Sequence, residues 1–363
     1  MKLRTKRASW MQALAVTAAG ALVLTGCSQD EGTGAGPEAG GAGGFDTGSV
    51  IGVALEEGGQ SEAQLFAQQL EESNFEAQVQ TAADPAEQVE QLTKMIEGDM
   101  EVLIVDAVDP AGLGEQLEAA KAKGVPIIAY KTLVTGTDAA DYFVSGDAFE
   151  AGAGQAQALL DGLGERHGKG PYNVELFSGD AGDGVARRVF DGAMSVLQPA
   201  VDNGTVAVAS GQTSFEDTAT KGAAPDEAKK RLDGLLGDTY KSEDLQGVLA
   251  VDDAVAQAVL GAAGSSRPDI VVVGGGSAAE AVESIMKDEQ YATTYTDPTA
   301  LISQAVSIVR RLSQDDQPAA DDPESYDNGE EAVPAFLAKV ETVTRENAPD
   351  VYAEDPELSK LAK

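Results

Sequence analysis

Short apolar runs alternate with amphipathic stretches along most of the chain. The runs are rich in β-branched residues and are bounded by Gly, Asp or Pro, which is typical of buried strands in a parallel sheet. They lie at 50–55, 102–108, 125–130, 142–145, 173–177, 247–251 and 270–273. Apolar residues recur at helical spacing between them. The alternation predicts an α/β protein built on doubly wound parallel sheets.

The helical stretches also carry start signals. Ala63, Phe66 and Leu70 fall on one helical face. Asp84-Pro85-Ala86-Glu87 combines an acidic N-cap, a proline in the first turn and a glutamate three residues after the cap, so a helix is expected to begin at Pro85. Similar numbers of strand–helix units precede and follow Phe149, which predicts two similar lobes.

The first residues differ in composition from the rest. Basic residues stand at 2, 4, 6 and 7, and an apolar run follows from Met11 to Leu24. This order is typical of a secretory signal, and the run is too short and too rich in Ala and Gly to favour a membrane-spanning helix. Residues 28–47 are rich in Gly, Ala and acidic side chains, as in a flexible tether.

The junction between signal and tether reads Leu24-Thr25-Gly26-Cys27. It resembles the lipobox of bacterial lipoproteins, which implies that residues 1–26 are removed and that Cys27 is lipidated and becomes the mature N-terminus. The alternative is a plain signal peptide with an incidental cysteine. A lipid anchor and a tether would hold the domain at a membrane surface.

Composition excludes several function classes. The chain has 363 residues, 61 acidic and 25 basic, and a net charge of −36, which argues against a nucleic acid partner. One Cys and one His leave no disulfide, no Cys- or His-rich metal site and no His-based triad. The acidic residues Asp180, Asp183, Asp252 and Asp253 lack calcium-loop spacing. We therefore expect no metal, no cofactor and no enzymatic activity.

Polar or glycine-rich loops follow five of the expected strands. They are 56–60, Lys131, 178–183, 252–253 and 274–277. Turns in α/β proteins are rich in Gly and Asp for backbone reasons alone. However, ligands bind beyond the carboxyl ends of parallel strands, so five such loops in two lobes predict a cleft where the lobes face each other.

Several longer motifs resemble a known family. The segments are GKGPYNVELFSG at 168–179, FDGAMSVLQP at 190–199, IIAY at 127–130, EQYAT at 289–293 and YDNG at 326–329. They are similar to the multiple-monosaccharide-binding proteins of bacterial ABC importers, in the periplasmic binding protein type I class. The resemblance spans about residues 48–348 of the printed sequence.

The resemblance implies two α/β lobes joined by three crossings, near Asp147, Thr296 and Val333. The expected lobes are 48–147 with 296–334, and 148–295 with 335–348, followed by a tail at 349–363. It also implies ligand contacts. Asp147, Arg187 and Asp253 would bind sugar hydroxyls, and Phe149 would lie against an apolar sugar face. The loops and the second crossing add the remaining candidates: Glu56, Gln60, Lys131, Asp183, Gly276 and Thr296.

The chain departs from the family pattern at three places. Lys131-Thr132 replaces Asp-Arg, Gly274–Ala278 replaces Gly-Gln-Asp-Ala-Glu, and Glu62-Ala63 replaces Arg-Trp. Lys131 suggests the hypothesis of a negatively charged ligand, such as a sugar acid. The alternative is that Lys131 pairs with Glu56, Glu57 or Asp253 and contacts no ligand.

These observations predict a monomeric, lipid-anchored solute-binding protein on the extracytoplasmic face of the cell membrane. It would capture a monosaccharide or sugar derivative between two closing lobes and deliver it to an ABC permease with its ATPase. Two alternatives stay open: an extracytoplasmic ligand sensor of the same fold, and a transporter binding protein for a non-sugar polar solute.

Overall fold

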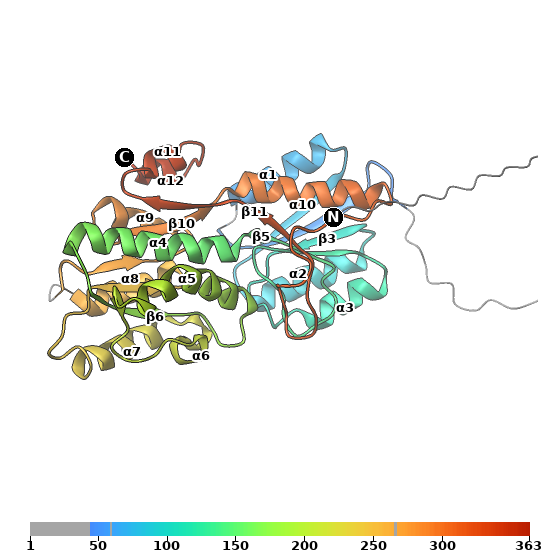
Figure 1. Cartoon of the computed structure of the whole chain (residues 1–363). Coiled ribbons are helices and arrows are strands. Elements are labelled where there is room, and N and C mark those ends of the chain that lie inside the picture. Colours follow the sequence, from blue (N-terminus) through green and yellow to red (C-terminus); the bar gives the residue numbers. More distant parts are fainter. Residues whose placement is uncertain (1–43, 59, 265–266) are drawn as a thin grey trace, which may run out of the picture. The chain divides into compact units, whose positions relative to one another are not determined.

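A computed structural model describes residues 44–58, 60–264 and 267–363. Strands and helices alternate along nearly all of this chain and build two six-stranded sheets (Figure 1). The predicted signal, Cys27 and most of the tether lie outside the described residues. Within the described ranges, no helix has the length and apolar character needed to cross a membrane.

The first sheet is entirely parallel, in the order β2-β1-β3-β4-β5-β11. Helices α1 and α10 cover one face with Phe66, Leu70 and Ile302, and α2 and α3 cover the other with Leu92 and Leu117. The strands are β1 (Val50–Glu56), β2 (Glu76–Ala82), β3 (Val102–Val105), β4 (Ile127–Tyr130), β5 (Tyr142–Gly146) and β11 (Ala335–Ala338). The helices are α1 (Gln60–Glu72), α2 (Pro85–Glu97), α3 (Gly114–Ala122) and α10 (Pro298–Ser313).

The second sheet follows the order β7-β6-β8-β9-β10-β12, and only its edge strand β12 is antiparallel. The strands are β6 (Tyr172–Phe177), β7 (Val206–Ala207), β8 (Gly247–Ala250), β9 (Val271–Val273), β10 (Ala292–Thr296) and β12 (Val340–Thr344). The longer helices are α4 (Ala148–His167), α5 (Gly184–Asp202), α7 (Pro225–Gly237), α8 (Asp253–Ala263) and α9 (Ala279–Met286). Four short helices complete it: α6 (Phe215–Thr218), the 3-10 turn η1 (Lys221–Ala223), α11 (Ala348–Val351) and α12 (Leu358–Leu361).

Helices α4 and α5 pack unusually closely on one face of the second sheet. A Cβ atom at Gly152 would lie 1.8 Å from the carbonyl oxygen of Val189, and one at Gly192 would lie 2.0 Å from that of Phe149. Both distances are far below van der Waals contact, so the two glycines permit the backbones to touch. The pair brings the N-termini of α4 and α5 to the same end of the lobe.

Aspartate side chains cap five of the helices in the described chain. The predicted helix start at Pro85 is confirmed, because the Asp84 side chain accepts a hydrogen bond from the Glu87 amide at 2.9 Å. Asp147, Asp183, Asp252 and Asp297 cap α4, α5, α8 and α10 in the same way. Each cap satisfies backbone amides that the helix itself leaves free.

The chain passes between the sheets three times. It leaves the first sheet between β5 and α4, returns between β10 and α10, and leaves again at Lys339 between β11 and β12. The last crossing falls later than the predicted position near Val333, because Ala335–Ala338 pairs in parallel with β5. The crossings touch: a Cβ at Gly146 would lie 2.4 Å from Thr296 Oγ1 and 3.1 Å from a methyl of Val340.

Candidate functional site

A cleft of about 1190 Å³ is bordered by the carboxyl ends of strands from both sheets. The first lobe contributes the ends of β1, β4 and β5 and the start of α1. The second contributes the start of α5 and the ends of β8, β9 and β10. This is where parallel α/β sheets bind ligands, and the volume exceeds the roughly 300–1000 Å³ that is usual for small-molecule sites.

Five of the ten predicted ligand-binding residues line this cleft: Glu56, Lys131, Asp183, Gly276 and Thr296. The other five do not: Gln60, Asp147, Phe149, Arg187 and Asp253. The structure also adds lining residues that the sequence reasoning did not select as binding residues, among them Glu62, Gln155, Asp252, Asp297 and the segment 354–358.

Lys131 belongs to a compact polar cluster on the first-lobe wall. Its Nζ lies 3.1 Å from Glu62 Oε1 and 3.3 Å from Asp106 Oδ2. Tyr130 donates its hydroxyl to the other Glu62 oxygen at 2.9 Å. The lysine therefore pairs with carboxylates other than the Glu56, Glu57 or Asp253 named from the sequence. Its positive charge, which motivated the sugar-acid hypothesis, is already compensated within the wall.

Burial and neighbouring charges shift the pKa values of this cluster. Burial raises the pKa of Asp106, although Lys131 and Thr132 act in the opposite direction. Burial disfavours the charged form of Lys131, but Asp106 and Glu62 outweigh it and raise the pKa of that ammonium. Burial and the Glu62 carboxylate raise the pKa of Tyr130 far above its ordinary value. Lys131 and Tyr130 are therefore hydrogen-bond donors throughout the neutral range.

The two adjacent aspartates at the start of α8 have different surroundings. Asp252 lines the cleft and caps α8 by accepting from the Val255 amide at 2.7 Å. Asp253 is 2% exposed, and burial raises its pKa. Its Oδ1 accepts from Gln290 Nε2 at 2.8 Å, and its Oδ2 accepts from Thr293 Oγ1 at 2.8 Å and the Ala278 amide at 2.9 Å. Asp253 thus fixes the loop after β9, whereas Asp252 faces the cleft.

Three of the four remaining predicted residues outside the cleft contact other groups of the protein. Asp147 accepts from the amides of Phe149 and Glu150. The Phe149 ring lies 5.2 Å from the Arg188 guanidinium. Arg187 donates to Asp191 at 3.0 Å and to Glu216 at 3.4 Å. Gln60 is exposed on the first turn of α1.

The glycine-rich loop after β9 lies against a buried glutamine. Gln155 is 1% exposed and donates its amide to the carbonyls of Gly274 at 2.9 Å and Val251 at 3.2 Å. A Cβ at Gly275 would lie 2.5 Å from this nitrogen, so the loop requires glycine there. The Gln155 carbonyl oxygen, Oε1, is buried and has no hydrogen-bond partner.

The C-terminal segment, predicted only as a tail, forms part of the cleft wall. Tyr352 is fully buried, its hydroxyl lies 2.6 Å from Ser277 Oγ, and its ring meets Tyr295 edge-on at 5.1 Å. Tyr295 also donates to Asp355 Oδ2 at 3.3 Å. These contacts bring Glu354, Asp355 and Glu357 to the cleft. No spacing in the sequence indicated this, because the contacts join residues far apart in the chain.

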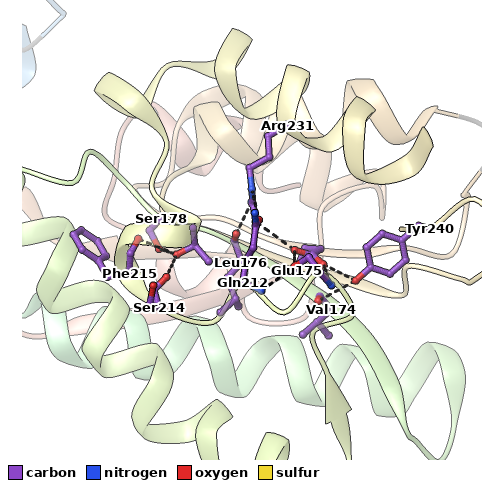
Figure 2. Close-up of polar contacts among 11 residues, drawn as sticks. Val174, Glu175, Leu176, Ser178, Gln212, Ser214, Phe215, Arg231 and Tyr240 are labelled. Carbon is purple, nitrogen blue, oxygen red and sulfur yellow. Dashed lines mark hydrogen bonds and ion pairs between the residues drawn. The ribbon is translucent and has the colours of Figure 1, made fainter. Parts of the chain in front are cut away.

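A buried ion pair supports the strand that leads to Asp183. Figure 2 shows Arg231 of α7 reaching the end of β6, where it donates to the Leu176 carbonyl at 2.7 Å and to Glu175 at 3.3 Å. Tyr240 donates to the other Glu175 oxygen at 2.6 Å, and the guanidinium lies 4.3 Å from the Phe177 ring centre. The carboxylate is fully buried and fully partnered, so this network holds β6 in place rather than offering a second site.

Across the described ranges, no cluster of three or more His, Cys, Asp or Glu side chains has the geometry to hold a metal ion. The cleft therefore offers carboxylates, hydroxyls, backbone groups and one ammonium for recognition. Such groups accept and donate hydrogen bonds to a polar organic ligand.

Comparisons with known proteins agree with this geometry. Residues 56–317 match the model of the periplasmic binding protein domain. The chain is 34% identical over 279 residues to the multiple sugar-binding periplasmic receptor ChvE of Rhizobium radiobacter, covering 75% of this chain and 78% of that protein. It is 33% identical over 286 residues to the multiple sugar-binding periplasmic protein SbpA of Azospirillum brasilense, covering 77% and 80%.

Solved structures are similar as well. An ABC transporter solute-binding protein of Clostridium phytofermentans with bound β-D-glucose superposes with a TM-score of 0.73 at 29% identity, covering 87% of this chain and all of that one. A carbohydrate transporter solute-binding protein of Chloroflexus aurantiacus in complex with D-glucose gives a TM-score of 0.69 at 27% identity, covering 85% and 96%.

Proposed function

The chain belongs to the periplasmic binding protein family, and on that premise we propose that it is the solute-binding protein of a bacterial ABC importer. It captures a monosaccharide or sugar derivative in the cleft between its lobes and delivers it to the permease. The observation that carries the proposal is the polar cleft at the carboxyl ends of both sheets, in a chain one-third identical to sugar-binding relatives.

The packing of the crossings supports capture by lobe movement. Gly146, Thr296 and Val340 touch where the three crossings meet, and Gly146 and Thr296 also line the cleft. A change of backbone angle at these few residues alters the angle between the lobes without repacking either core. Closure around a sugar removes its hydroxyls from water and replaces the lost hydrogen bonds with those of the cleft wall.

The first residues support a position of the protein at the extracytoplasmic face of the cell membrane. The basic start, the apolar run and the Leu24–Cys27 motif support export and lipidation of Cys27. The acidic and glycine-rich tether would let the domain work in water beside the membrane. We expect a monomer that has no catalytic activity.

The test is a dye-based thermal-shift screen of residues 28–363 against neutral sugars, amino sugars, sugar acids, polyols and nucleosides. A ligand at about 100 times its dissociation constant adds roughly 2.7 kcal/mol to the free energy of unfolding, which raises the melting temperature by a few degrees. A shift with any monosaccharide supports the proposal. No shift with any sugar, together with a shift from another solute class, contradicts it.

A further inference from the structure

The charges around the cleft are strongly unbalanced. Its lining side chains include a single lysine, Lys131, and that ammonium is paired with Glu62 and with Asp106 behind it. The other lining carboxylates make no ion pair with any cation in the described part of the chain. They are Glu56, Asp183, Asp252, Asp297, Glu354, Asp355 and Glu357.

Helix ends offset only part of this charge. Asp183, Asp252 and Asp297 cap α5, α8 and α10, whose N-termini each carry about half a positive charge. A capped helix start therefore retains about half a negative charge. Asp355 accepts from the Glu357 and Leu358 amides, whereas Glu56, Glu354 and Glu357 have no helix end to offset their charge. Because a cleft with low-dielectric walls focuses its field, the excess acts on any ligand inside it.

Gln155 adds a hydrogen-bonding requirement to this excess of negative charge. Gln155 lines the cleft and is 1% exposed, and its amide nitrogen is committed to the carbonyls of Gly274 and Val251. Its Oε1 is left as a buried acceptor without a donor. Buried acceptors are costly when unsatisfied, so this position calls for a ligand that donates. An ammonium offers three donors and no acceptor, whereas a carboxylate offers acceptors only.

Resting on the proposed function, we propose that the cleft selects a monosaccharide that carries a protonated amine and rejects one that carries a carboxylate. The ammonium lies among the unpaired carboxylates, and the sugar hydroxyls bond to the remaining wall. Burial raises the pKa of Asp183 and of Asp252, although backbone amides at the two helix starts act in the opposite direction. The compensated Lys131 leaves no free positive charge for a sugar acid.

The first experiment compares matched ligands by calorimetric titration of residues 28–363 at low salt. The probes are glucosamine, glucose and glucuronate, with galactosamine, galactose and galacturonate as a second set. We expect the amine of one set to bind about fivefold more tightly than its neutral parent, since one screened charge contact contributes about 1 kcal/mol. The preference should shrink as salt is raised to about 0.5 M. The uronates should not bind measurably.

The outcomes separate the two proposals. Equal binding of amine and neutral parent, or binding of a uronate, overturns the charge selection and leaves sugar capture intact. If no monosaccharide of any charge binds, the proposed function itself fails.

Charge-neutral variants give a sharper test. Asp252→Asn with Asp297→Asn removes two cleft charges but keeps an oxygen for each cap, which accepts from Val255 at 2.7 Å and Thr299 at 2.8 Å. The ratio of amine to neutral affinity should fall at least threefold. Asp84→Asn, the same change at the α2 cap outside the cleft, should leave the ratio unchanged.

An unchanged ratio in the folded double variant contradicts the proposal. Should that variant melt far below the parent chain, Glu354→Gln with Glu357→Gln carries the same expectation. Both glutamates are exposed and neither side chain caps a helix, so we expect the two substitutions to preserve the fold.

Discussion

At the scale of single residues, Lys131 is the group that makes the first-lobe wall stable. It joins Glu62 and the nearly buried Asp106, whose side chain is 5% exposed. Lys131→Met leaves two facing carboxylates without a cation. Breaking a buried pair costs about 3–5 kcal/mol, but the lysine is partly solvated, so we expect a loss of about 2 kcal/mol in the free energy of unfolding. Chemical denaturation measures it.

The matched control is Lys94→Met. Lys94 pairs with Glu90 at 2.6 Å on the exposed face of α2, and its removal should leave stability nearly unchanged, because exposed ion pairs contribute little. Adding Asp106→Asn to Lys131→Met should restore part of the loss, because the variant no longer buries an unpaired charge. Equal effects of the two lysine substitutions would show that the cluster contributes nothing beyond a surface pair.

The adjacent residues Asp252 and Asp253 illustrate a limit of prediction from sequence. Asp252 and Asp253 follow the same strand, and the motif resemblance selected Asp253 for the ligand. The structure places Asp252 at the cleft, because the capping residue precedes the first helical turn, whereas Asp253 turns inward to Gln290 and Thr293. Only the packing of β9 and β10 distinguishes the two, and that packing is not encoded in local spacing.

At the scale of elements, the close pair α4 and α5 depends on two glycines. Gly192→Ala would place a methyl 2.0 Å from the Phe149 carbonyl oxygen. Since backbone must move to admit it, we expect a loss of about 3 kcal/mol or more in the free energy of unfolding. Gly261→Ala on α8 is the control. Beyond its chain neighbours and the backbone of its own helix, no atom lies within 4 Å of the added Cβ, so this change should raise stability by up to about 1 kcal/mol. The melting temperatures of both variants test this expectation. A Gly192→Ala variant as stable as the parent chain would contradict the packing argument.

Strand prediction succeeded where strands are buried and failed where they are at edges or polar. The apolar runs at 50–55, 102–108 and 142–145 coincide with β1, β3 and β5 to within a few residues. The pattern missed β2, an edge strand that alternates polar residues, and β10, whose sequence is ATTYT. It also missed β11 and β12, the edge strands on either side of the third crossing. Strands β2 and β12 leave most of their side chains partly or fully exposed, so a search for continuous apolar runs overlooks them.

At the scale of the whole molecule, we expect stability to rise as pH falls from about 8 to about 5. Burial raises the pKa of Asp106 and of Asp253 above the ordinary Asp value of about 3.9. Between the ordinary Asp value and the raised pKa values, the folded chain binds more protons than the unfolded chain, so stability falls as pH rises through that interval. Protonation also reduces the repulsion of a net charge of −36. Melting temperatures across this pH range measure the effect.

Two half-buried aspartates act in the opposite sense. Backbone hydrogen bonds lower the pKa of Asp180, and hydrogen bonds with Ser325 and Glu324, aided by Arg188, outweigh burial and lower that of Asp322. Their contribution is lost only below the ordinary Asp value, so it does not cancel the rise above about pH 5. About 1 M salt screens the general repulsion and isolates the part due to burial. A melting temperature that falls from pH 8 to 5 would contradict the prediction.

The position of β11 and β12 also governs the order in which the molecule can assemble. Strand β11 pairs with β5, nearly two hundred residues earlier in the printed chain, and β12 pairs with β10. A nascent chain that stops before residue 335 therefore leaves an open edge on both sheets at once. Each lobe lacks one strand of its sheet until residues 335–344 have been synthesised. Such long-range pairings slow folding. We therefore expect the sheets of both lobes to be completed late and at the same stage of folding.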